Sequence, residues 1–150
     1  MIDPRRAFCT VVALIALSAV IGSTSAAQQR DGDGDQKPTL AMRATPPVGF
    51  TPLRVSASVD VRGGADDYAE FYCAAVEWEW GDGTMSESSS DCDPYEAGQS
   101  TIERRFRAEH VYRQAGTYRV VFRLKQRDRT VAFTSARVQV RPGIRDGFGG

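Results

Sequence analysis

Among the residue types in this chain, histidine is the one to consider first as a possible catalytic base. The 150-residue sequence contains one histidine, His110, and no Gly-x-Ser-x-Gly segment. Nucleophilic hydrolysis requires a nucleophile, a neighbouring base and a group that orients the base. Because no nucleophile is evident beside His110, we interpret it as a structural hydrogen-bonding residue. The sequence therefore predicts a protein that is not an enzyme.

Clustered aspartates suggest a second kind of chemistry, the binding of Ca²⁺ through carboxylate oxygens. The segment from Asp31 imitates the start of an EF-hand loop, but Gln36 and Met42 stand where that loop has its Gly and its Glu. We interpret Asp82 as the cap of a tight turn, because no oxygen-ligand spacing around it is diagnostic. We expect no metal and no cofactor. Weak calcium binding stays open as an alternative, with Asp66, Asp67, Asp91 and Asp93 as further possible ligands.

Two of the three cysteines, Cys73 and Cys92, belong to the part of the chain that follows an N-terminal apolar segment. An even pair in a small exported domain indicates a disulfide. A zinc site would need more ligands than two cysteines and one histidine supply. The bond would tie a long polar loop to a central strand, and the loop-entropy model gives it roughly 3 kcal/mol.

The first 27 residues have the layout of a secretory signal peptide. Arg5 and Arg6 form a basic start, and a weakly polar to apolar run extends from Phe8 to Ile21 before a group of small residues. A membrane span would need roughly 20 apolar residues, and this run is shorter. The arginine pair also resembles the twin-arginine export motif, so the route of export stays open. We expect a secreted, periplasmic or cell-envelope protein with no membrane span after signal removal.

Charge narrows the possible partners. The whole chain has a formal net charge of 0, and loss of Asp3, Arg5 and Arg6 with the signal leaves −1. Binding to nucleic acid needs a clear basic excess, so no nucleic-acid partner is expected.

The remaining chain has the pattern of one β domain. Residues 28–37 are polar and predict a flexible linker, residues 38–141 the domain, and residues 142–150 a disordered tail. Period-two segments and turn residues, without a convincing helical period, predict an immunoglobulin-like, seven-stranded antiparallel β-sandwich. The expected strand segments include 40–44, 53–59, 71–80, 101–112, 117–126 and 130–140.

The strand expected at 71–80 leads into a Gly-Asp-Gly turn. Trp78 and Trp80 share one face of this strand and are expected in the core. Gly81 and Gly83 permit positive φ, and Asp82 between them can accept hydrogen bonds from turn amides.

Two segments carry a resemblance to a known family. Trp78-Glu79-Trp80-Gly81-Asp82-Gly83-Thr84 resembles the Trp-x-Phe-Gly-Asp-Gly-Thr signature of polycystic kidney disease (PKD) domains. His110-x-Tyr112, followed by Gly116-Thr117-Tyr118-x-Val120, resembles the second hallmark of that family. The resemblance covers about Pro38 to Val140, and it departs from the family at Trp80 and in the loop that carries Cys92. It implies a sandwich that makes protein or carbohydrate contacts at the cell envelope or outside the cell. Tyr118 follows a Gly turn and is placed as a corner tyrosine.

Two surfaces are candidates for binding. The outward face of the strand at 117–126 is basic, with Arg119, Arg123 and Lys125, although Glu77 and Glu79 on the neighbouring strand are expected to pair with these cations. The second surface is the long polar loop after the Gly-Asp-Gly turn, with Asp91, Asp93 and Tyr95. Asp91 and Asp93 could also imitate the two carboxylates of a glycosidase, but a domain of this size offers little cleft.

Three functions follow as hypotheses. The first is a non-catalytic, secreted interaction module that binds an extracellular or envelope protein or polysaccharide. The alternative is a structural or assembly domain of the cell envelope with no small ligand. An accessory domain of a hydrolase is the third, and the oligomeric state stays open.

Overall fold

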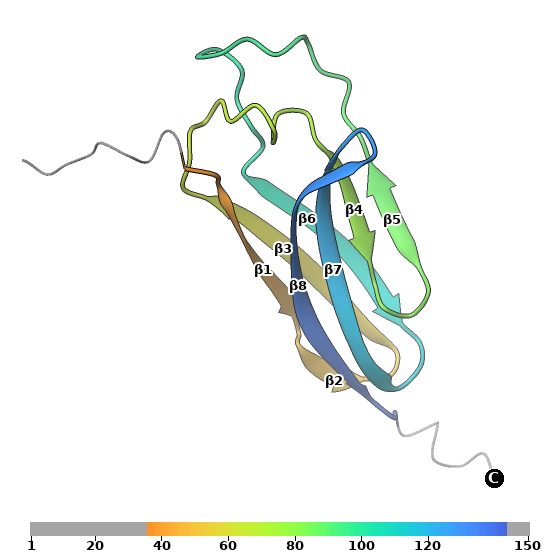
Figure 1. Cartoon of the computed structure of the whole chain (residues 1–150). Coiled ribbons are helices and arrows are strands. Elements are labelled where there is room, and N and C mark those ends of the chain that lie inside the picture. The colour runs from red at the N-terminus through yellow and green to blue at the C-terminus, as the bar shows by residue number, and fades with distance from the viewer. Residues whose placement is uncertain (1–35, 144–150) are drawn as a thin grey trace, which may run out of the picture.

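The computed structural model describes residues 36–143, and this part of the chain is built from β-strands in two sheets (Figure 1). The expected signal peptide at 1–27 and most of the linker and tail lie outside the described residues, so the domain division stays a prediction. Between residues 36 and 143 there is no helix long and apolar enough to cross a membrane. The strands are β1 (Thr39–Thr45), β2 (Val48–Phe50), β3 (Leu53–Arg62), β4 (Ala75–Glu79), β5 (Met85–Ser88), β6 (Arg105–Tyr112), β7 (Gly116–Gln126) and β8 (Arg129–Arg141).

The two sheets form a sandwich. One sheet has the strand order β1-β3-β6, and the other has the order β2-β8-β7-β4-β5. The long connection after β5 extends beyond one end of the sandwich, and the β4–β5 turn lies at the other end (Figure 1). The expected fold class, an all-β immunoglobulin-like sandwich, is confirmed.

Four details differ from the sequence-based expectation. The described residues contain eight strands where seven were expected, and β2 pairs with β8 in parallel although every other pairing is antiparallel. β5 lies within a stretch expected to be a loop, because all four of its residues are exposed and show no apolar alternation. The strand expected at 71–80 begins only at Ala75, because the preceding residues turn, with Cys73 at φ 51°.

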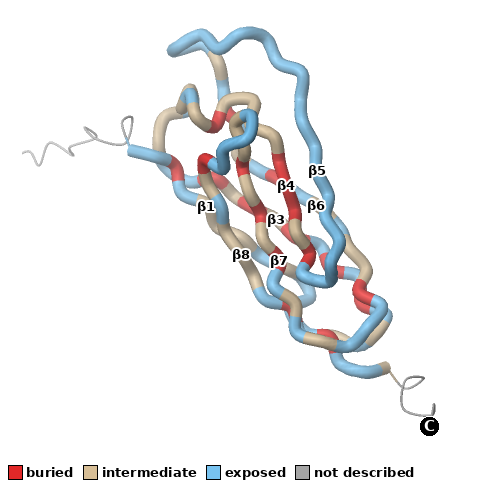
Figure 2. The backbone as a smooth tube through the Cα atoms, turned by 45° about the vertical axis from the view of Figure 1, so that its right-hand side comes forward, coloured by how far each residue is buried: buried red, intermediate tan, exposed pale blue. Residues whose placement is uncertain are grey.

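The core lies between the two sheets and follows from period-two alternation. In β3, Leu53, Val55, Ala57, Val59 and Val61 are buried while the residues between them are more exposed. Figure 2 shows the buried positions on the paired strands, and exposed positions along β5 and the connection that follows it. The other sheet contributes large side chains to the same core: Val76, Trp78, Trp80, Val120, Phe122, Leu124, Val131, Val138 and Val140.

Candidate functional site

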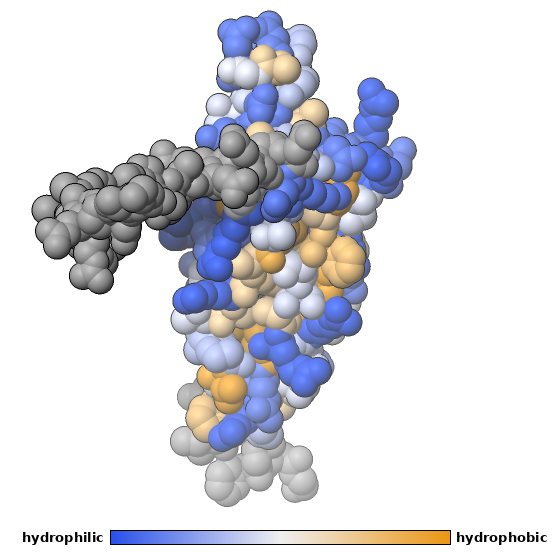
Figure 3. Space-filling view, turned by 60° about the vertical axis from the view of Figure 1, so that its left-hand side comes forward, coloured by the Kyte–Doolittle hydropathy of each residue, from blue (hydrophilic) through white to orange (hydrophobic). Residues whose placement is uncertain are grey.

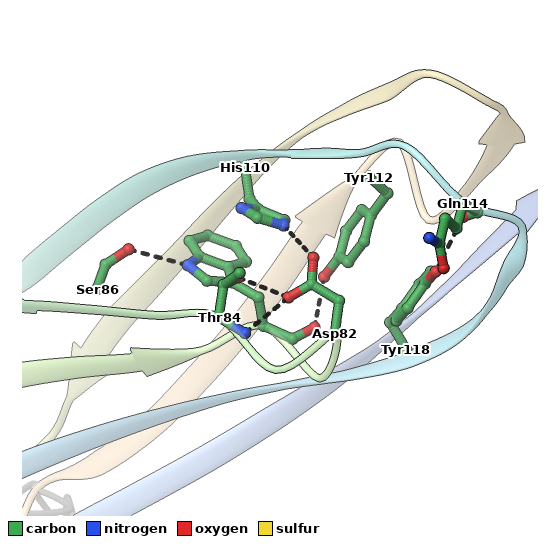
Figure 4. A network of polar contacts seen from close by, with 8 residues as sticks. Asp82, Thr84, Ser86, His110, Tyr112, Gln114 and Tyr118 are labelled. Atoms are coloured by element: carbon green, nitrogen blue, oxygen red, sulfur yellow. Dashed lines mark hydrogen bonds and ion pairs between the residues drawn. The ribbon is translucent and has the colours of Figure 1, made fainter.

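The two motif segments meet at one end of the sandwich in a polar network around Asp82 (Figure 4). Oδ1 of Asp82 accepts hydrogen bonds from the Thr84 amide at 3.1 Å and from the Thr84 hydroxyl at 2.6 Å. Oδ2 lies 2.6 Å from Nε2 of His110. An ionised carboxylate only accepts hydrogen bonds, so Nε2 of His110 carries the proton of this contact. The turn after β4 is thereby joined to β6 in the opposite sheet.

This His–Asp pair is not arranged as part of a nucleophilic triad. In such a triad the base stands between the nucleophile and the carboxylate. Here the Thr84 hydroxyl donates to Asp82, so the carboxylate stands between the hydroxyl and the imidazole. The side chains of His110 and Asp82 are only 17% and 22% exposed. The geometry supports a structural role for His110.

Aromatic rings continue the network into the core. The Trp80 ring stacks on His110 with centroids 4.8 Å apart, and lies nearly parallel to the Trp78 ring at 5.8 Å. Nε1 of Trp80 donates to Ser86 Oγ at 3.0 Å, so the polar atom of the ring is satisfied. The rings therefore link β4 to β6 by packing, in addition to the hydrogen bonds of Asp82.

Two tyrosines complete this end of the sandwich. The buried hydroxyl of Tyr112 donates to the backbone oxygen of Trp80 at 2.8 Å, and its ring stacks on Tyr118 at 4.3 Å. The Tyr118 hydroxyl donates to the backbone oxygen of Gln114 at 2.9 Å, which is the contact of a corner tyrosine. Burial raises the pKa of Tyr112, so its hydroxyl stays protonated and keeps donating.

Gly81 gives a direct test of the turn. Gly81 and Gly83 both have positive φ, at 82° and 88°. A Cβ at Gly81 would lie 2.8 Å from the backbone oxygen of Arg119, whereas a Cβ at Gly83 would meet nothing within 4 Å. We expect Gly83→Ala to lower the free energy of unfolding by about 1 kcal/mol, and Gly81→Ala by about 2 kcal/mol, because only the second adds a backbone clash to the strain of positive φ. Urea unfolding of both variants measures this difference, and equal losses would contradict it.

The Asp82 carboxylate predicts a pH dependence of stability. Burial acts to raise the pKa of Asp82, but hydrogen bonds from the Thr84 hydroxyl, His110 and the Thr84 amide outweigh burial, and the pKa lies below its ordinary value of 3.8. A depressed pKa in the folded state means that the unfolded state binds more protons, so stability is present above pH 3.8 and is lost as pH falls through the folded-state pKa.

Asp82→Asn should remove part of this acid dependence and cost about 1–2 kcal/mol at neutral pH, because charge-assisted hydrogen bonds are lost. Thermal unfolding between neutral pH and pH 3 compares it with Asp91→Asn, a matched change of an exposed loop acid. If the two variants lose the same amount of stability between neutral pH and pH 3, Asp82 does not contribute to the acid dependence.

Two of the three candidate cations on β7, Arg123 and Lys125, are neutralised by carboxylates. Arg123 contacts Glu77 at 2.9 Å and Glu79 at 2.8 Å, and Lys125 contacts Glu77 at 3.0 Å, so the expected cross-strand pairs are present. Glu77 is only 8% exposed. The pKa of Glu77 is lowered chiefly by the hydrogen bond from Lys125, against the effect of burial and with a further hydrogen bond from Arg123. Arg119 is separate from this cluster and donates to the Ser135 hydroxyl. Arg123 and Lys125 are thus engaged with carboxylates and not available as free cations.

The long loop is held in place by a disulfide and by tyrosine hydrogen bonds. The expected disulfide between Cys73 and Cys92 is present, with the Cα atoms 6.1 Å apart. The Tyr72 hydroxyl donates to the backbone oxygen of Asp93 at 3.0 Å, and the Tyr95 hydroxyl donates to that of Asp67 at 2.7 Å. The two rings lie 5.6 Å apart.

A shallow hollow accompanies this loop. Its lining combines ring edges, carboxylates, amides and hydroxyls, from Tyr72, Asp93, Pro94, Glu96, Gln99, Ser100 and Thr101. Asp91 is exposed and takes part in no ion pair among the described residues. Within residues 36–143, no three His, Cys, Asp or Glu side chains are grouped so that they could hold a metal ion. Tyr72 was not predicted as a residue of this site, because it was expected within a strand. Its position next to Cys73 was the signal that could have placed it at the disulfide.

Exposed large hydrophobic side chains are distributed over different elements. They are Val48 and Phe50 in β2, Met85 in β5, Tyr95 in the long loop and Phe133 in β8. Figure 3 shows one side of the molecule, where hydrophobic surface in the middle is bordered by hydrophilic side chains.

Comparison with known proteins adds two structures of similar shape. No family model and no curated protein matches the chain. The PKD domain of an M14-like peptidase from a Thermoplasmatales archaeon is 15% identical, with a TM-score of 0.47, over 69% of this chain and 96% of that domain. The CARDB domain of a Pyrococcus furiosus protein, solved in complex with di-metal ions, is 16% identical, with a TM-score of 0.49, over 70% of this chain and 88% of that one. Likeness at this level carries no argument about function.

The molecule's own features define its class. It is an immunoglobulin-like β-sandwich, and the two segments that resemble PKD signatures meet in one network in its structure. The chain is accordingly an immunoglobulin-like β-sandwich domain, and the residues of its two PKD-resembling segments make contacts within the fold.

Proposed function

We propose that this chain is an exported, non-catalytic interaction module, and that its long loop binds a protein or polysaccharide of the cell envelope or the extracellular space. The observation that carries the proposal is the fixation of this loop. The Cys73–Cys92 bond, two tyrosine hydroxyls and the bond from the Gly98 amide to Asp67 at 2.7 Å all restrain it.

Holding the loop in one conformation costs free energy, and packing in the core does not offset this cost. Ordering a polar loop costs conformational entropy, and the residues from Ser89 to Gly98 are all exposed, with the Tyr95 ring against Tyr72 as their aromatic contact. A loop that is already ordered pays less when it binds, so preorganisation increases affinity. The position also favours binding, because loops at the end of a rigid sandwich are free to vary while the strands keep their packing.

The lining of the hollow favours a polar partner. Tyrosine offers a rigid amphipathic surface, and amides, carboxylates and hydroxyls around it can exchange hydrogen bonds with sugar hydroxyls or with a peptide backbone. The disulfide supports export, since such bonds persist in oxidising compartments. Together these features support binding at the envelope or outside the cell.

A pull-down from envelope extract tests the proposal, with the purified chain as bait and glycan arrays as a second readout. Tyr95→Ala should reduce capture severalfold, because it removes an exposed aromatic side chain of the loop and its hydrogen bond to Asp67, and aromatic anchors make large contributions to binding. Phe133→Ala is the matched control, because it also removes an exposed aromatic side chain but from strand β8, away from the loop. Phe133 is 67% exposed, and Tyr95 is 41% exposed. Capture no better than that of an unrelated neutral β-sandwich, or equal loss in both variants, would overturn the proposal.

A further inference from the structure

The outer face of the β1-β3-β6 sheet carries a group of arginines that the sequence pattern did not single out. The even-numbered residues of β3 point away from the core, and the register places their partners in β1 and β6 on the same face. The charged side chains on this face are five arginines and two acids: Arg43, Arg54, Arg62, Arg105, Arg107, Asp60 and Glu109. We call this surface the arginine face.

Only part of the charge on the arginine face is neutralised. Asp60 pairs with Arg105 at 2.9 Å, and Glu109 pairs with Arg54 at 3.2 Å. Arg43, Arg62 and Arg107 are exposed, and none of them has an ion-pair partner within residues 36–143. The face therefore has a positive excess, and its three unpaired arginines differ from Arg123 and Lys125 of β7, which Glu77 and Glu79 occupy.

Two of the three unpaired arginines, Arg43 and Arg107, lie in a row across the sheet. Ser58 of β3 stands opposite Arg43 of β1 on one side and opposite Arg107 of β6 on the other. Neighbouring strands lie about 4.8 Å apart, so the three backbone positions span about 10 Å across the sheet. Arg43, Ser58, Asp60, Arg62, Arg105 and Arg107 line one shallow depression. Guanidinium groups bind carboxylate and sulfate groups through two parallel hydrogen bonds, which suits them to repeated anionic groups.

The remaining side chains on the arginine face favour a polysaccharide over other anionic partners. Hydroxyls of Thr39, Ser56 and Ser58 stand among the arginines on this face and can exchange hydrogen bonds with sugar hydroxyls. None of the exposed large hydrophobic residues of the described chain belongs to β1, β3 or β6. Aromatic side chains are frequent anchors of protein interfaces, and single-stranded nucleic acids stack on aromatic rings, so partners of both kinds would lack an aromatic anchor here.

We propose that the arginine face binds an acidic polysaccharide, whose carboxylate or sulfate groups are held by Arg43, Arg62 and Arg107 around Ser58. This site is separate from the long loop, and binding at one does not require the other.

Binding of the full chain to immobilised polygalacturonate and heparin, across a range of salt concentrations, tests the proposal. Arg43→Gln combined with Arg107→Gln should weaken binding about tenfold or more and flatten its salt dependence, because two guanidinium contacts are lost. The matched control is Arg119→Gln with Arg137→Gln, which removes two exposed arginines that stand opposite each other on the other sheet. Ser58→Glu supplies a second variant that keeps the arginines and introduces a negative charge between them, and it should also abolish binding.

Each outcome decides the proposal. Loss of binding in the arginine-face variants, with the control unchanged, supports it. Equal loss in the control pair, no binding to either polysaccharide, or capture only by polyphosphate or polyglutamate would overturn it. Tyr95→Ala should leave polyanion binding unchanged, so failure of the loop proposal and failure of this one give different results.

Discussion

Replacement of Trp80 by Ala is expected to lower the free energy of unfolding by about 3–5 kcal/mol, the range for deletion of a large buried aromatic side chain. Trp80 is 1% exposed and stacks between Trp78 and His110, so its removal leaves a cavity and unstacks the histidine. The Ser86 hydroxyl also loses its donor. Urea unfolding followed by circular dichroism measures the loss.

Trp80→Phe is the graded control for this prediction. Phe keeps an aromatic ring against His110 but loses the hydrogen bond to Ser86 and part of the volume, so we expect a smaller loss of about 1–2 kcal/mol. Similar losses in the Ala and Phe variants would contradict the packing account, because they would assign the whole effect to the indole hydrogen bond.

Removal of the disulfide by Cys73→Ser with Cys92→Ser is expected to lower the free energy of unfolding by about 3 kcal/mol. The two cysteines are 19 residues apart, and the bond closes this loop in the unfolded chain as well, so its loss increases the entropy of the unfolded state. The measurement is denaturant unfolding of the double variant beside the oxidised parent chain.

A matched control separates the effect of the crosslink from that of the cysteine side chains. The parent chain in the presence of a thiol reductant should show the same loss as the double variant, while the double variant should not respond to reductant. A double variant as stable as the oxidised chain would show that the loop is equally restrained without the bond. The tyrosine contacts to Asp93 and Asp67 would then be sufficient to hold it.

Features that depend on residues close together in the sequence were predictable. Alternation of apolar residues from Leu53 to Val61 indicated a half-buried strand, and the structure has β3 at that place. The Gly-Asp-Gly sequence indicated a turn, and both glycines have positive φ there. An even pair of cysteines indicated a disulfide without any knowledge of the fold.

Features of exposed elements could not be predicted in the same way. β5 has four exposed residues and is recognised only by its pairing with β4 at the edge of the sheet. β2 has three residues and is defined by its pairing with the distant β8. Neither strand has a hydrophobic period, because neither buries a face, so sequence patterns contain no signal for them.

The fold class, the core positions of the long strands, the Gly-Asp-Gly turn and the cysteine pair were predictable, because each depends on a local pattern or on composition. Which arginines are neutralised depends on contacts between distant strands. Arg123 meets Glu77 across β4 and β7, and Arg43 stands beside Ser58, because strand register brings together residues that are far apart in the chain. Whether a cation has a carboxylate partner depends on these long-range pairings, so the charges along a single strand do not indicate which basic positions stay unpaired.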